Sequence, residues 1–235
     1  MWAKQILEPG VEFKGVEPYP NEDALISHLK DVIAKAGKQP KVLVIGALGR
    51  CGGGAVDLFV KAGLDESNIQ RWDMAETAKG GPFEEILDSD IFVNCIYLSK
   101  PIPHFVDRES IEKKGDDRRL TVVCDVSCDT TNPHNPIPIY NINTTFDKPT
   151  VAVEGVKYVS SLLEEHRLLT VSLRGKPLDV ISIDHLPSLL PREASEAFST
   201  DLLPSLLALK DRETTPVWTR AKKLFDEKVA SLPTN

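Results

Sequence analysis

Residues 41–54 read KVLVIGALGRCGGG, and this stretch decides the fold. Its first part, 41–47, is a short apolar run rich in branched side chains, which is typical of a strand buried on both faces. Glycines follow at positions 46, 49, 52, 53 and 54, and residues 55–62 predict a helix that Gly63 closes. A strand, a glycine turn and a helix in this order form the first unit of a doubly wound α/β domain.

Further apolar runs predict the other strands of a parallel sheet. They lie at 68–73, 90–98 and 120–127, with shorter ones at 150–153 and 179–184. Helices or loops of about 10–25 residues separate them, which indicates βαβ units with right-handed crossovers. The predicted fold class is therefore α/β, a Rossmann-type doubly wound parallel sheet, with ligands at the carboxyl ends of the strands.

Helices are expected before and after this sheet. Asn21 is a good N-cap for an amphipathic helix that Gly37 can close. After Pro191, residues 192–210 predict a helix kinked or broken at Pro204, and residues 217–230 predict another.

Composition excludes several classes of protein. The 235 residues are 41% hydrophobic and 27% charged, which is ordinary for a globular chain. The net charge of −7 disfavours a nucleic-acid partner, and no apolar run approaches the roughly 18 residues of a membrane span. The N-terminus lacks the apolar segment of a secretory signal. The four cysteines form no C-x-x-C pair, so structural zinc is not expected, and they indicate a reducing compartment.

The glycine turn predicts a diphosphate site. Residues 46–52 have the spacing G-x-x-G-x-x-G, a variant of the dinucleotide fingerprint. Such a turn lets the backbone approach a diphosphate with no Cβ in the way and aims the N–H groups of the next helix at it. Arg50 adds a cation beside the phosphates. The alternative is a merely flexible turn.

Asp73 supplies the acidic partner that the fingerprint requires. It ends the second predicted strand, 27 residues after Gly46, near the expected offset of about 20 residues. A carboxylate there can accept hydrogen bonds from both ribose hydroxyls and repels a 2′-phosphate, which favours NAD over NADP. The alternative is a helix or turn cap.

The later strand ends supply the rest of the ligand crevice. Tyr97 could pack against adenine or ribose, or belong to the rim of the core. Asp184 and His185 follow the last predicted strand, where they are well placed for the nicotinamide end; the alternative for Asp184 is an N-cap. Cys51 and Cys95 could lie close enough for a redox-sensitive disulfide, although a pair of buried thiols is the default interpretation.

These motifs together resemble a known enzyme family. The chain closely resembles the fungal-type, NAD-dependent, lysine-forming saccharopine dehydrogenases, over about residues 20–230. The resemblance is carried by GALGRCG at 46–52, the strand end at 72–73, GGPF at 80–83, NCIYL at 94–98, DVS at 125–127, TTNPHNPIP at 130–138 and DHLPSLLPREAS at 184–195.

The resemblance implies a two-domain enzyme like alanine dehydrogenase. Residues 1–40 would be a linker and helix from the catalytic domain, 41–187 the NAD-binding domain, and 188–235 helices that return to a largely missing catalytic domain. Ser127 would lie beside saccharopine. The residues that would contact NAD are Gly49, Arg50, Asp73, Thr77, Tyr97, Val126, Ile183, Asp184, His185 and Leu186.

The chain departs from the family pattern in two places. The family carries a long segment before the position of Met1, which holds the catalytic lysine and histidine, so the chain resembles an N-terminally truncated member with no catalytic residue of its own. Residues 156–175 have no counterpart in the family pattern. They could be a retained intron, since the codons of Val156-Lys157-Tyr158 can form a splice donor, or a surface helix inserted between strands.

The activity that the resemblance implies is oxidation of saccharopine to lysine and 2-oxoglutarate with hydride transfer to NAD. We expect this chain to bind NAD but to show little turnover alone. The alternatives are a non-catalytic NAD-binding fragment and another amino-acid dehydrogenase of the alanine dehydrogenase type. The expected partners are these small molecules, with no nucleic acid, membrane or metal, and the family suggests a cytoplasmic monomer.

Overall fold

The computed structural model describes residues 1–153 and 176–233, and the predicted insertion at 156–175 lies outside the described residues. The chain divides into two compact units. The first comprises Met1–Glu17 and Asp23–Leu186, and the second comprises Pro18–Glu22 and Pro187–Asn235. The assignment of residues 1–40 and 188–235 to a catalytic domain stays a prediction.

The first unit is built on a six-stranded sheet with strand order β2-β1-β3-β4-β6-β5. Strands β1 to β4 and β6 are parallel, as predicted, whereas β5 at the sheet edge runs antiparallel to β6. The strands are shorter than the apolar runs because each run extends into the connecting loops. Their bounds are β1 Val42–Ile45, β2 Ile69–Trp72, β3 Ile91–Asn94, β4 Val122–Asp125, β5 Val151–Ala152 and β6 Asp179–Ile181.

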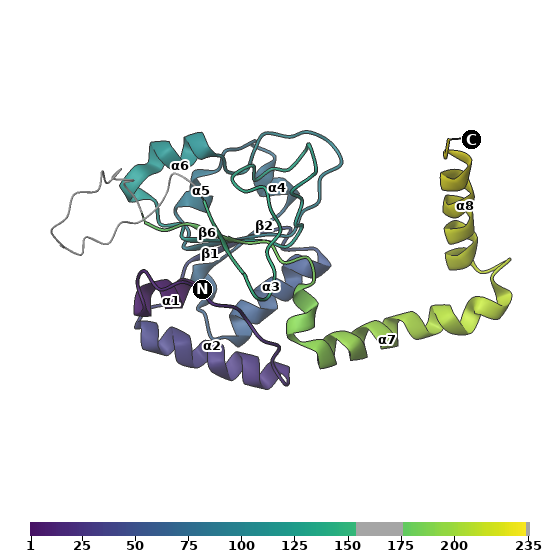
Figure 1. Ribbon diagram of the computed structural model, residues 1–235, viewed down its shortest axis with the longest axis horizontal. Helices are drawn as coiled ribbons and strands as arrows, with labels where there is room; N and C mark the ends of the chain where they lie inside the picture. Colours follow the sequence, from purple (N-terminus) through teal and green to yellow (C-terminus); the bar gives the residue numbers. More distant parts are fainter. Residues whose placement is uncertain (154–175, 234–235) are drawn as a thin grey trace. The chain divides into compact units, whose positions relative to one another are not determined.

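Helices cover both faces of this sheet, which confirms the doubly wound α/β fold (Figure 1). One face carries α1 (Trp2–Leu7), α2 (Glu22–Ala36) and α3 (Arg50–Lys61), and the other carries α4 (Met74–Thr77), α5 (Glu84–Leu87) and α6 (Arg108–Lys114). The short 3-10 helices of this unit are η1 (Glu66–Asn68) and η2 (Gly115–Asp117).

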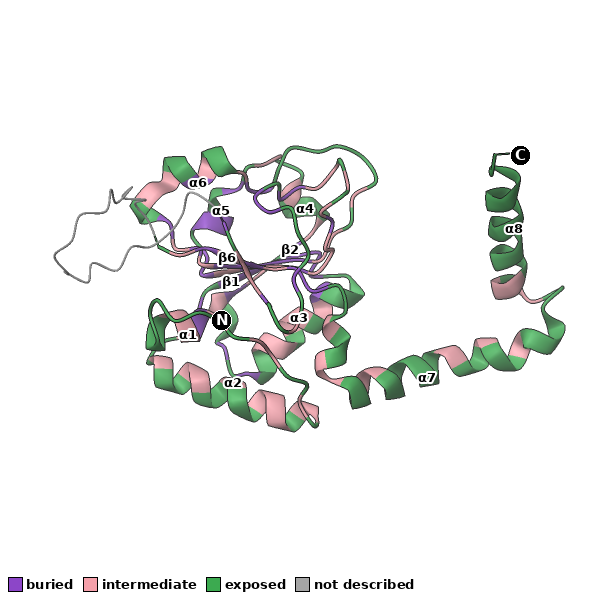
Figure 2. Ribbon diagram, in the orientation of Figure 1, coloured by how far each residue is buried: buried purple, intermediate pink, exposed green. Residues whose placement is uncertain are grey.

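The alternation of side chains along β1 explains why both faces are covered. Leu43 and Ile45 pack into the cluster that contains α5 and α6, while Val42 and Val44 contact residues of α2 and α3. All four residues are fully buried, and buried residues are concentrated in the strands (Figure 2). Burying four branched side chains stabilises the unit by about 1.5–3 kcal/mol each before conformational entropy is subtracted.

Two helix bounds differ from the sequence-based expectation. Helix α3 begins at Arg50 instead of residue 55, because its glycines at 52–54 lie within the first helical turns. In the second unit, α7 (Pro191–Leu207) is not broken at Pro204 but continues to Leu207, and it is followed by η4 (Ala208–Asp211) and α8 (Pro216–Ala230). The 3-10 helix η3 (Leu186–Leu189) precedes α7.

Candidate functional site

The carboxyl edge of the sheet brings together the segments that the sequence singled out. Because the strands are parallel and in register, the residues that follow β1, β2, β3, β4 and β6 all emerge at this edge. The chain runs from β1 to β2 on one side and later to β3 on the other side, so the strand order reverses at β1. Such a reversal is where open α/β sheets bind ligands.

The glycine turn after β1 has no room for side chains. Gly46 has a φ of +84°, and a Cβ added there would lie 3.1 Å from the Cys95 carbonyl oxygen. A Cβ added to Gly52 would lie 2.0 Å from the carbonyl oxygen of Gly46. The first turn of α3 therefore packs directly on the backbone of the turn. The spacing of these glycines therefore has a steric cause.

The N-terminus of α3 is open to an anion. Gly49 is its N-cap, with an extended backbone and no side-chain capping hydrogen bond. The first N–H groups of a helix have no carbonyl partner within it and carry the positive end of its dipole. Arg50 is exposed, and Leu48 is 86% exposed, so the turn faces solvent. This arrangement suits a phosphate or diphosphate group.

Asp73 links the end of β2 to the glycine turn. Its Oδ2 accepts a hydrogen bond from the Leu48 N–H at 3.1 Å, and its Oδ1 accepts one from the Met74 N–H at 3.0 Å. It is also the N-cap of α4 in a capping box with Glu76. The cap proposed as the alternative is therefore present, and the carboxylate also lies directly beside the turn. The Thr77 hydroxyl donates to the Asp73 carbonyl oxygen at 2.9 Å, which keeps Thr77 next to it.

The other predicted residues lie along the same edge with different exposure. Tyr97, after β3, is 70% exposed and so is not part of the core rim. Asp184 and His185 are exposed, and the His185 ring contacts the Phe146 ring at 4.7 Å. Ile183 is buried, so only its backbone can reach a ligand. Val126 and Leu186 are partly exposed.

Ser127 belongs to a buried polar cluster that the sequence-based prediction missed. The Asp125 carboxylate accepts hydrogen bonds from the hydroxyls of Ser127 and Tyr140, both at 2.6 Å, and from Asn94 Nδ2 at 3.0 Å. The Ser182 hydroxyl donates to the Tyr140 oxygen at 3.3 Å. The position of Asp125 at the end of a predicted strand was a sequence signal that could have indicated part of this cluster. Tyr140 lies in a proline-rich loop whose path no local pattern reveals.

The cysteines of this edge are free thiols in the structure, so the Cys51–Cys95 disulfide is not formed there. Cys51 is exposed, whereas Cys95 is partly buried. Burial, followed by the nearby Cys51, raises the pKa of the Cys95 thiol to about 12. Cys95 therefore stays protonated and weakly nucleophilic at neutral pH. Redox-linked formation of this bond stays a prediction.

A metal centre and a membrane span are both without candidates in the described ranges. Within residues 1–153 and 176–233, no group of three or more His, Cys, Asp or Glu side chains could hold a metal ion. In the same ranges, each helix is too short or too polar to cross a bilayer.

Comparison with known proteins agrees with the resemblance predicted from the motifs, although no family model matches the chain. Saccharopine dehydrogenase (NAD(+), L-lysine-forming) of Neurospora crassa is 60% identical over 99% of this chain and 59% of that protein. The protein of the same name from Schizosaccharomyces pombe is 56% identical over 99% of this chain and 60% of that protein. The chain thus spans about three fifths of the length of these relatives and is homologous to them throughout its own length.

One further relative and one solved structure are also similar to this chain. The saccharopine dehydrogenase of Candida albicans is 58% identical over 95% of this chain and 55% of that protein. A solved structure of an L-alanine dehydrogenase is 15% identical, with a TM-score of 0.47, and the alignment covers 84% of this chain and 58% of that one.

Proposed function

We propose that this chain is the nucleotide-binding part of a saccharopine dehydrogenase (NAD(+), L-lysine-forming). The observation that carries the proposal is the hydrogen bond between the Leu48 N–H and Asp73. It supports a diphosphate site at the glycine turn with a ribose-binding carboxylate beside it. The identity of 60% to the Neurospora crassa enzyme supports the substrate assignment.

NAD would lie across the carboxyl edge of the sheet. The amides at the start of α3 and the Arg50 guanidinium would hold the diphosphate, and Asp73 would accept hydrogen bonds from the adenosine ribose. Thr77 and Tyr97 would line the adenosine side. The remaining predicted contacts would line the nicotinamide side, and they are Val126, Ile183, Asp184, His185 and Leu186, with Ser127 facing saccharopine.

The proposed reaction converts saccharopine and water to lysine and 2-oxoglutarate. NAD, when bound, accepts the hydride from the glutaryl carbon. The described residues would orient the dinucleotide and form one wall of the site. The resemblance assigns the proton transfers to a lysine and a histidine in the part of the relatives that this chain does not span.

The apolar side chains of the second unit support a role in a larger protein. Phe198, Leu207 and Phe225, on α7 and α8, are each about two-thirds exposed. Large exposed apolar side chains in this number mark a surface that contacts another part of a protein. We propose that α7 and α8 pack on a catalytic domain, in a cytoplasmic monomer.

A chimera tests the whole proposal. The N-terminal part of the Neurospora crassa enzyme, joined ahead of this chain, should oxidise saccharopine with NAD and leave alanine unchanged. The 235-residue chain alone should bind NADH and show no turnover. Oxidation of alanine by the chimera would instead favour a different amino-acid dehydrogenase. A chimera that binds NADH but oxidises neither compound would favour a non-catalytic binding fragment.

A further inference from the structure

The buried cluster at the end of β4 fixes the hydrogen-bonding role of Ser127. Asp125 is wholly buried, and its Oδ1 lies 2.6 Å from the Ser127 hydroxyl oxygen and 3.1 Å from the Ser127 backbone nitrogen. An ionised carboxylate only accepts hydrogen bonds, so the Ser127 hydroxyl must donate its single proton to Asp125. The same oxygen atom of Asp125 therefore takes both donors of Ser127.

The other partners of Asp125 keep this arrangement in one state. The Tyr140 hydroxyl lies 2.6 Å from Asp125 Oδ2. Burial, followed by the charge of Asp125, strongly raises the pKa of Tyr140, so the phenol keeps its proton and donates it. Asn94 Nδ2 lies 3.0 Å from Oδ1. Each of these groups donates to the Asp125 carboxyl group, which acts as the acceptor toward Ser127 as well.

The Ser127 oxygen then has only acceptor capacity left for a ligand. A hydroxyl oxygen has two lone pairs, and one of them faces Asn94 Nδ2 at 3.3 Å. The remaining lone pair belongs to a residue that is partly exposed at the carboxyl edge. Ser127 follows β4, whereas Asp73 follows β2, and these two strands lie on opposite sides of β1. In the proposed binding mode, the β4 side of the edge holds the nicotinamide.

We propose that Asp125 is a positioning residue that makes Ser127 an obligate hydrogen-bond acceptor, which selects an N–H donor of the bound ligand. The inference rests on the proposed function. The N–H donor is the carboxamide of nicotinamide or an amino group of the amino-acid ligand, and the two sources share this chemistry.

A pair of dinucleotides tests the proposal on the 235-residue chain. NAD carries a carboxamide with N–H donors, whereas nicotinic acid adenine dinucleotide carries a carboxylate that only accepts. Calorimetry should show that the unmodified chain binds NAD at least about tenfold tighter. Ser127→Ala should reduce this ratio to about one, and Ser127→Thr, which keeps the hydroxyl, should retain it. A ratio of two affinities is not moved by a general loss of stability.

The Asp125→Asn variant tests the positioning step. Its amide can donate to Ser127, which frees the hydroxyl to donate to a ligand, so the ratio should also fall toward one. ADP-ribose, which lacks nicotinamide, should bind both variants as tightly as it binds the unmodified chain. If Asp125→Asn does not fold, Tyr140→Phe gives the second test: it leaves the Asp125–Ser127 hydrogen bond in place and should keep the ratio, and a ratio near one in Tyr140→Phe would contradict the proposal.

The amino-group source has its own measurement. If Ser127→Ala leaves the dinucleotide ratio unchanged but weakens lysine binding to the NADH-loaded chain about tenfold, the donor is the ammonium group and the proposal stands. If Ser127→Ala changes neither quantity, the proposal is wrong while the proposed function survives. If the unmodified chain binds neither NADH nor ADP-ribose, both this proposal and the proposed function are wrong.

Discussion

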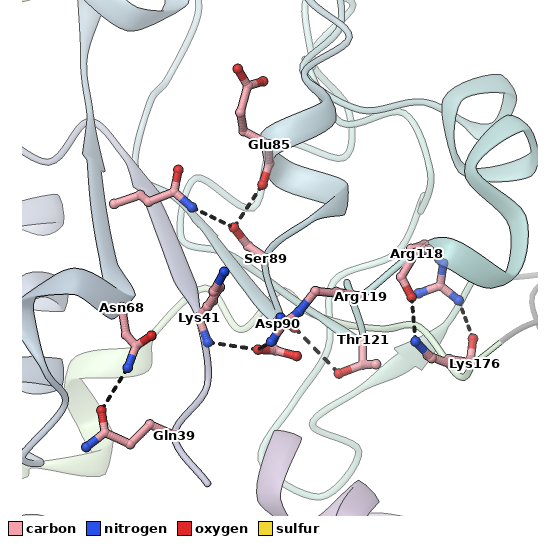
Figure 3. Close-up of polar contacts among 11 residues, drawn as sticks. Gln39, Lys41, Asn68, Glu85, Ser89, Asp90, Arg118, Arg119, Thr121 and Lys176 are labelled. Atoms are coloured by element: carbon pink, nitrogen blue, oxygen red, sulfur yellow. Dashed lines mark hydrogen bonds and ion pairs between the residues drawn. The ribbon is translucent and has the colours of Figure 1, made fainter.

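The two edges of the sheet carry similar residue types but use them differently. At the amino edge, the Asp90 carboxylate accepts hydrogen bonds from the Lys41 N–H at 2.8 Å and from the Arg119 guanidinium at 2.6 Å (Figure 3). At the carboxyl edge, Asp73 accepts hydrogen bonds from the backbone N–H groups of Leu48 and Met74 and remains partly exposed. Asp90 thus holds neighbouring segments together at the amino edge, whereas Asp73 lies beside the glycine turn at which we propose that a ligand binds.

The remaining polar contacts of the amino edge follow the same principle. Asn68 donates to Gln39 at 3.0 Å, and Lys176 Nζ donates to the Arg118 carbonyl oxygen at 3.0 Å while Arg118 donates back to the Lys176 carbonyl (Figure 3). These bonds tie the starts of β2, β4 and β6 to neighbouring segments. These polar contacts at the amino edge therefore contribute to the stability of the sheet.

The largest effect is expected at the glycine turn of the carboxyl edge. Gly52→Ala should lower the free energy of unfolding by about 3 kcal/mol and abolish NADH binding, because its Cβ would overlap the Gly46 carbonyl. Gly54→Ala, in the same helix with nothing within 4 Å, is the matched control and should stabilise the chain by about 0.5–1 kcal/mol. Urea unfolding and calorimetry measure both. Equal behaviour of the two variants would contradict the steric account.

The next largest effect separates stability from binding at the amino edge. Asp90→Ala should cost about 2 kcal/mol of unfolding free energy, because it leaves the Lys41 N–H and Arg119 without their acceptor. NADH affinity should stay within about twofold. Asp88→Ala removes an ion pair between the exposed Asp88 and the partly exposed Lys114 and should cost less than about 0.5 kcal/mol. A selective loss of NADH affinity in Asp90→Ala would break the comparison.

The reverse behaviour is expected of Asp73. Asp73→Ser should weaken NADH binding about tenfold, because it removes the acceptor for the ribose hydroxyls. Serine also caps helices well, so urea unfolding should shift by less than about 0.5 kcal/mol. A loss of stability as large as that of Asp90→Ala would show that Asp73 serves α4 alone.

The smallest effect concerns Asp179, a partly buried carboxyl group of the amino edge that lies near the N-terminal ammonium group of Met1. Desolvation raises the pKa of Asp179 above its ordinary value of 3.8, although Gln5 donates to it at 2.8 Å. A raised pKa means that the contribution of Asp179 to stability is present at low pH and lost as the pH rises through that pKa. Asp179→Asn should thus stabilise the chain at pH 7 by less than about 1 kcal/mol, and the gain should shrink toward pH 4. A gain independent of pH would exclude this explanation.

The sequence predicted the alternation of strands and helices because buried parallel strands are continuous apolar runs. The sequence did not predict the antiparallel direction of β5, since a two-residue edge strand carries no directional pattern. Helix α3 begins earlier than predicted because its glycines serve close packing on Gly46, which propensity alone disfavours.

Some of the predicted ligand contacts followed from chain order, because they come soon after a strand, and the rest were implied by the family resemblance. Asp73 and Tyr97 illustrate this, and both lie at the carboxyl edge. The cluster around Asp125 depends on Tyr140 and Ser182, which are 15 and 42 residues from their respective partners Asp125 and Tyr140. Contacts at such separations are set by tertiary packing and leave no periodic signal.

The measurement that tests the central claim most directly is a calorimetric titration of the 235-residue chain with NADH and, separately, with NADPH. The dinucleotide site that we propose at the glycine turn, with Asp73 beside it, predicts that NADH binds and that NADPH binds at least about tenfold more weakly, because its 2′-phosphate would meet a carboxylate. Absence of NADH binding, or NADPH binding as tight as that of NADH, would contradict the account.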